Sequence, residues 1–343
     1  MKKVPKLRPG DKVAILSPSF AAPAVWPHVH ELGLRRLREV FNLVPVEYPT
    51  TRKLNASGEE RAADLIAAFT DPEIKAVIAT IGGDDQVTYI KNLSTEPFIN
   101  NPKPFFGYSD NSHLSNFLFL NGIPSFYGGS IFTQYAMQGE MDEYTIKYLR
   151  HALFEEGEFE LLPSETFTEK GQDWNDLTTL NTKREHQSNV GWHWDGVQNA
   201  SGILWGGCVE CVDEMFRHDT PIPTLEQFND IVLIFETSEE IPSADYVYRF
   251  FRALGERGIL KRVQGVLIGR PKAWEFDKQY SPVEREEYRQ AQNEAILKAV
   301  RTYNKIIPVV QNLNFGHTDP QIPMPYGNKV KIDLENKLII AKF

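Results

Sequence analysis

Short apolar segments alternate with helical patterns over residues 1–155, and this alternation restricts the possible folds more than any other feature of the sequence. Repeated strand–helix units form parallel sheets that helices cover on both faces. Ligands bind such sheets beyond the carboxyl ends of the strands. The sequence therefore predicts an α/β fold with a parallel sheet in this region. Strands are expected at 12–18, 43–46, 76–81, 104–107 and 124–129, and helices at 32–40, 61–69 and 142–154.

The pattern changes after this region. Residues 156–195 are polar and have few periodic apolar positions, so we expect a linker that continues as a long surface loop. Long loops in compact proteins often bind substrates or act as lids. From residue 196 to 343, strand and helix patterns mix and end in a hairpin. We predict a domain over 1–155, a linker and substrate loop over 156–195, and a C-terminal domain over 196–343.

The charge and the cysteine content exclude several classes of protein. The formal net charge of −9 argues against nucleic-acid binding, which depends on a basic surface. No apolar segment is long enough to span a bilayer, and no apolar region of signal-peptide length follows the basic start at Met1. The two cysteines, Cys208 and Cys211, form no disulfide framework without a second pair. We therefore expect a cytoplasmic protein that binds neither nucleic acid nor membrane.

The stretch from Pro104 to His113 combines an apolar run, a glycine, a serine and helix-capping residues. This order predicts a strand, a sharp turn and a helix, with Ser109 exposed in the turn. Amide N–H groups at the start of a helix stabilise negative charge, which the oxyanion beside a serine nucleophile requires. Gly107-x-Ser109 matches the first half of the G-x-S-x-G elbow, but Asn111 replaces the second glycine. A helix cap without chemistry is the alternative interpretation.

A serine nucleophile needs a base, and the base needs an acid that orients it. His317 is the best-placed histidine, because it follows a predicted strand and lies on a turn. Glu236 ends the most apolar strand of the second half, where an unpartnered carboxylate would be costly. A structural turn histidine and a rim carboxylate bonded to backbone are the alternatives.

Gly82 and Gly83 also end a predicted strand, and glycine there lets a backbone N–H approach a ligand closely. With the N–H of Asp110, this pair would form a two-donor oxyanion hole. The sequence lacks the glycine patterns that bind nucleotide phosphates, so no cofactor is predicted. Asp84 and Asp85 lack the His and Cys partners of a closed metal site, so no metal is predicted.

Three tryptophans, Trp192, Trp194 and Trp205, lie close together in the sequence. Two of them belong to the polar loop, where burial in a core is a poor explanation. A flat surface for a nucleobase is one interpretation, and core packing is the other. Cys208 and Cys211 have the spacing of redox and zinc motifs, but the adjacent glycines and valine favour two buried small residues.

Several blocks of the chain together resemble the LD-carboxypeptidase family of serine peptidases, in particular its microcin C immunity (MccF-like) branch. The resemblance covers nearly the whole chain, and the block around Ser109 is the most specific. Asn111-Ser112 and Cys208 depart from the Ile-Thr and Asn that are usual in the family. The blocks are 7–11 with 17–19, 71–76 with 82–83, 101–103 with 107–110, 235–236 with 252–254 and 258–260, and 315–317 with Pro323 and Gly327.

The resemblance implies a catalytic triad of Ser109, Glu236 and His317. It also implies an oxyanion hole formed by the amides of Gly83 and Asp110. The implied fold pairs a flavodoxin-like N-terminal domain with a smaller, β-rich α/β C-terminal domain. Members of the family are commonly dimers, so a homodimer is expected.

The resemblance leaves two substrate classes. MccF-like members cut the amide between an aminoacyl group and a modified nucleotide, as in aminoacyl-sulfamoyl adenylates. Murein-recycling members release D-Ala from a tetrapeptide stem. The tryptophan loop favours the peptidyl-nucleotide class, because loop tryptophans stack the adenine in that branch. A non-catalytic ligand-binding protein on the same scaffold is a third alternative. The implied substrate contacts are Gly82, Trp192, Trp194, Trp205 and Cys208.

Overall fold

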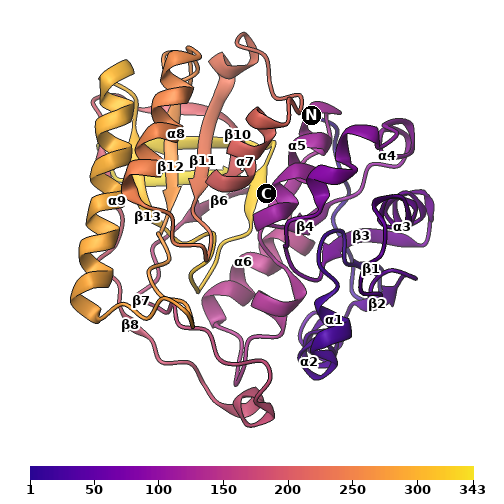
Figure 1. The fold of residues 1–343 in the computed structure, drawn as a ribbon. Coiled ribbons are helices and arrows are strands. Elements are labelled where there is room, and N and C mark those ends of the chain that lie inside the picture. The colour runs from indigo at the N-terminus through magenta and orange to yellow at the C-terminus, as the bar shows by residue number, and fades with distance from the viewer.

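Two β-sheets, each built mainly from one half of the chain, stand side by side (Figure 1). The computed structural model describes residues 1–343. The first sheet has the order β14-β5-β4-β3-β1-β2, and its five N-terminal strands run parallel in the doubly wound order of flavodoxin. The predicted flavodoxin-like sheet is thereby confirmed. Its strands are β1 (Lys12–Leu16), β2 (Val44–Glu47), β3 (Ile74–Ala79), β4 (Phe105–Gly107), β5 (Ser125–Tyr127) and β14 (Met324–Tyr326).

Local sequence signals explain where the helices of this half begin. Ser57 accepts a hydrogen bond from the N–H of Glu60, and the Glu60 side chain accepts one from the N–H of Ser57, which closes a capping box. The helices are α1 (Ala22–Val25), α2 (Pro27–Glu39), α3 (Gly58–Thr70), α4 (Glu96–Asn100), α5 (Ser112–Leu120) and α6 (Glu143–Phe154).

The second sheet has eight strands in the order β6-β16-β15-β10-β11-β12-β13-β9. Its four central strands are parallel, and antiparallel strands extend it on both sides. The predicted β-rich C-terminal part of the fold, with a sheet of its own, is thereby confirmed. The central strands are β10 (Ala200–Cys208), β11 (Ile231–Glu236), β12 (Gly265–Gly269) and β13 (Val309–Leu313). The outer strands are β6 (Glu158–Leu161), β9 (His193–Asp195), β15 (Lys329–Asp333) and β16 (Leu338–Lys342). The helices are α7 (Val209–Arg217), α8 (Ala244–Glu256) and α9 (Pro282–Tyr303), and the short pair β7 (Thr166–Phe167) and β8 (Gln187–Ser188) stands apart.

The two halves of the chain are interleaved. The segment over 156–195 supplies β6 and β9, which form opposite edges of the second sheet. Conversely, β14 leaves the second half and pairs with β5 of the first sheet. One apolar cluster includes both Val13 of β1 and Val266 of β12, so the sheets share a core. None of the helices combines the length and apolarity that crossing a membrane needs.

Candidate active site

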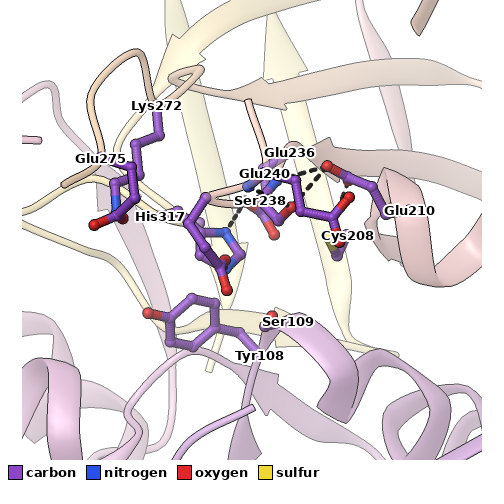
Figure 2. A network of polar contacts seen from close by, with 12 residues as sticks. Tyr108, Ser109, Cys208, Glu210, Glu236, Ser238, Glu240, Lys272, Glu275 and His317 are labelled. Atoms are coloured by element: carbon purple, nitrogen blue, oxygen red, sulfur yellow. Dashed lines mark hydrogen bonds and ion pairs between the residues drawn. The ribbon is translucent and has the colours of Figure 1, made fainter. Parts of the chain in front are cut away.

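Ser109 lies in a tight turn between β4 and α5, as the sequence predicts. Its φ of 63° is in the left-handed region, which residues other than glycine seldom adopt and which is often found at functional sites. Its N–H donates a hydrogen bond to the Tyr127 hydroxyl over 3.2 Å. The Ser109 hydroxyl makes no hydrogen bond within the protein and faces the space above the turn (Figure 2).

Glycine is required opposite this turn. A Cβ atom on Gly82 would lie 2.8 Å from the Ser109 Cβ, 3.0 Å from its Oγ and 3.4 Å from the amide nitrogen of Asp110. Its absence leaves room for a reacting group beside the hydroxyl and the Asp110 N–H. Gly83 follows with a φ of +140°, and Asp110 itself is buried, with its carboxylate accepting from the N–H of Gln86 at 3.1 Å.

Glu236 and His317 come from the ends of different strands and form a close pair (Figure 2). The Nδ1 of His317 donates to Oε2 of Glu236 over 2.6 Å, and Tyr127 donates to Oε1 of the same carboxylate over 2.6 Å. Gly316 makes this approach possible, because its φ is +96° and a Cβ there would lie 2.5 Å from the Glu236 carboxylate. Tyr127 therefore links the backbone of Ser109 to the acid, a contact that the sequence gives no signal for.

His317 has a second acidic neighbour. Its Nε2 lies 3.1 Å from Oε2 of Glu239, which is on the loop after β11. The Tyr108 ring packs against the imidazole edge to face, with centroids 5.0 Å apart. Burial alone would lower the pKa of His317, but the two carboxylates raise it well above its ordinary value. The imidazole in turn lowers the pKa of Glu239 to about 2, against the effect of partial dehydration.

Ser109 and His317 line one cavity of about 630 Å³, whose walls come from both halves of the chain. One part of the wall is aromatic and consists of Phe20, Trp26, Phe132 and Trp174. The Trp26 and Trp174 centroids are 5.1 Å apart, and Trp26 Nε1 donates to Asn175 over 2.9 Å. The segment that precedes β8 is therefore held against Trp26, which lies between α1 and α2.

The other predicted substrate residues do not share one location. Gly82 lines the cavity, whereas Trp192, Trp194, Trp205 and Cys208 do not. Trp205 is fully buried, and its Nε1 donates to Asn116 over 3.0 Å. Cys208 is also buried, and its N–H donates to the Ser112 hydroxyl over 3.1 Å.

The two loop tryptophans belong to the edge of the second sheet. Trp194 is in β9, which pairs with β13, and it lines a separate groove. Trp192 is part-buried and donates from Nε1 to Asn314 over 3.1 Å. The aromatic residue that this polar segment brings to the cavity is Trp174 instead. Pairing of β9 with the sheet, which spacing alone does not reveal, is the physical reason for the difference.

One buried group has the composition of a metal site. Asp110, His113 and Cys211 each offer a ligand atom, and these atoms lie within 4.8 Å of one another. Protein carboxylates already flank the imidazole, because His113 Nε2 lies 3.6 Å from Asp110 and 3.3 Å from Glu214. The group is therefore explained by pairing within the protein. Cys208 and Cys211 form no disulfide.

Comparison with known proteins gives consistent matches along the chain. Residues 13–128 match the LD-carboxypeptidase N-terminal domain, and residues 201–332 match the LD-carboxypeptidase C-terminal domain. A putative carboxypeptidase of Treponema pallidum is 27% identical, over 100% of this chain and 95% of the relative. The microcin C7 self-immunity protein MccF of Escherichia coli is 25% identical, over 96% of this chain and 92% of the relative. The crystal structure of an MccF-like protein from Streptococcus pneumoniae in complex with AMP superposes with a TM-score of 0.85 at 27% identity, covering 97% of this chain and 98% of that one.

Proposed function

The chain belongs to the LD-carboxypeptidase family, and we propose that it hydrolyses amide bonds with Ser109 as nucleophile, His317 as general base and Glu236 as orienting acid. The observation that carries this proposal is the Glu236–His317 pair, which lies at the cavity that Ser109 also lines. Ser109 and His317 line the cavity, and Glu236 holds the imidazole from behind, which is the order that an activated serine requires.

In the proposed reaction, the Ser109 oxygen attacks the scissile carbonyl and its proton passes to Nε2 of His317. The same proton then goes to the leaving amine as the carbon–nitrogen bond breaks. A water molecule then attacks the resulting ester and gives a proton to His317. The bond between the acyl carbon and the Ser109 oxygen breaks, His317 returns the proton to that oxygen, and the acid is released. Glu236 holds Nδ1–H and stabilises the imidazolium, and Tyr127 fixes the carboxylate for that task.

The proposed oxyanion hole consists of the amides of Gly83 and Asp110. It is supported by the open space that Gly82 leaves in front of the Asp110 nitrogen. Preorganised N–H donors at such a position stabilise the charge that develops on the carbonyl oxygen.

The proposed substrate is an aminoacyl group joined through an amide to a modified nucleotide. The aromatic wall of the cavity supports this class, since nucleobases stack on such side chains. The AMP complex of the similar Streptococcus pneumoniae protein supports it further. In this proposal Trp174 and Trp26 hold the base, in place of the tryptophans that the sequence suggests.

Product analysis tests the proposal. The protein is incubated separately with aspartyl-sulfamoyl adenosine and with a tetrapeptide stem that ends in D-Ala, and products are identified by mass spectrometry. We expect release of aspartate from the first substrate, and none from Ser109→Ala. Release of D-Ala alone would assign the muropeptide carboxypeptidase activity instead. If neither substrate is consumed and both still bind, the protein is a binding module.

A further inference from the structure

Both ring nitrogens of His317 face carboxylates. Nδ1 is 2.6 Å from Glu236, and Nε2 is 3.1 Å from Glu239. The first contact is the one that the proposed reaction uses. The second contact occupies the nitrogen that has to accept the proton of Ser109. Because Nε2 carries a single N–H or a single lone pair, it cannot serve Glu239 and Ser109 together.

The Glu239 contact also favours the wrong protonation state. A general base must be neutral, and two carboxylates stabilise the imidazolium. The only ion pair of Glu239 is with His317, and its side chain is 54% exposed, so it can move away without leaving a buried charge. Glu236 is 1% exposed and held by Tyr127, so it stays. Glu239 can therefore move away from the imidazole, whereas Glu236 stays in contact with it.

The charged groups around His317 indicate which kind of ligand would draw Glu239 away from the imidazole. The two cationic side chains of the cavity already have acidic partners: Lys272 lies 2.5 Å from Glu275, and Arg184 lies 2.8 Å from Asp319. Three further carboxylates of the wall have no Lys or Arg partner, namely Asp84, Asp173 and Glu240. The groups that face the imidazole are Glu236, Glu239 and Tyr108. Behind them lie Tyr127 next to Glu236, Lys272 near Glu239 and Asp319 near Tyr108.

A cavity with this excess of negative charge attracts cations. We propose that Glu239 is a positioning residue that holds His317 away from Ser109 until an ammonium group of the substrate takes its carboxylate. The enzyme then selects acyl groups that carry an ammonium group within reach of Glu239. This inference rests on the proposed function, because it assumes that Ser109 and His317 react together.

A small reagent tests the Glu239 contact without knowledge of the substrate. A fluorophosphonate reacts with an activated serine: the serine oxygen bonds to phosphorus, fluoride leaves, and the proton passes to the base. The rate of Ser109 labelling therefore reports how available His317 is. It is measured from pH 5 to 9 for the wild type, Glu239→Gln, Glu239→Ala and, as a matched control, the exposed Glu226→Gln. Each protein is labelled in the presence of n-propylammonium chloride and, separately, of n-propanol plus sodium chloride, which has the same alkyl chain and salt but no ammonium group.

We expect both Glu239 variants to label about tenfold faster than the wild type near neutral pH, which corresponds to one pKa unit. Removing a carboxylate lowers the pKa of His317, so the acid limb of the profile moves to lower pH. Propylammonium should accelerate the wild type and Glu226→Gln but neither Glu239 variant. An unchanged acid limb, or acceleration that persists in Glu239→Gln, overturns the inference. If folded wild-type protein shows no Ser109 adduct under any condition, the proposed function itself fails, and this outcome is distinct from the others.

Discussion

At the scale of single residues, the carboxylate of Glu236 accounts for most of the geometry of the site. It is buried, and each of its oxygens accepts one hydrogen bond, from Tyr127 and from His317. Both partners donate and Glu236 accepts, and such hydrogen bonds are strongest when the acceptor is a carboxylate. Gly316 and Gly269 have no side chains at positions where a Cβ would collide with the Glu236 side chain.

Replacement of Glu236 by Gln should reduce kcat about 10³- to 10⁴-fold, because an amide neither stabilises the imidazolium nor fixes the Nδ1–H tautomer. We expect KM to change little, since Glu236 does not line the cavity. Steady-state kinetics check both values, and circular dichroism checks that the variant is folded. A folded variant with kcat within threefold of the wild type would contradict the assigned role.

At the scale of elements, the segment before β8 closes one side of the cavity. Trp174 packs edge to face against Trp26 and against Phe132, with centroid distances of 5.1 and 5.3 Å. Its carbonyl lies 2.7 Å from the ring nitrogen of His28. These contacts place the flat Trp174 side chain of the polar segment against the first half of the chain, in the wall of the cavity.

Replacement of Trp174 by Ala should raise KM for aspartyl-sulfamoyl adenosine about tenfold and leave kcat nearly unchanged. Stacking of a base on an aromatic side chain contributes about 1–3 kcal/mol, and this change removes it. Trp194→Ala is the matched control, because Trp194 lies in β9 outside the cavity. If Trp194→Ala raises KM and Trp174→Ala does not, the stacking surface is the one that the sequence suggested.

The elements also show what the sequence could and could not predict. Long apolar runs and glycine turns predicted the strand that ends at Glu236 and the strands that precede Ser109 and His317, because these signals are local. Trp194 was misplaced because β9 has three residues, too few to show a period of two. Tyr127 and Glu239 were missed as site residues, because no local sequence signal at either residue points to its partner in the fold.

At the scale of the whole molecule, two sheets share a core, and residues that follow β4, β11 and β13 line one cavity. The sequence predicted the α/β class and a parallel sheet in the first half. It did not predict that β14 returns to the first sheet or that β6 and β9 extend the second, because short edge strands lack a pattern of their own. The domain boundaries at 155 and 195 remain a prediction.

The central claim is that Ser109 is activated by His317, and site-mapped labelling tests it most directly. Folded protein is treated with a fluorophosphonate, and the adduct is located by peptide mass spectrometry in the wild type, Ser109→Ala and His317→Ala. The account predicts one adduct, on Ser109, that is absent in Ser109→Ala and slowed at least about 10²-fold in His317→Ala. An adduct on another residue, or equal labelling of the wild type and His317→Ala, would contradict it.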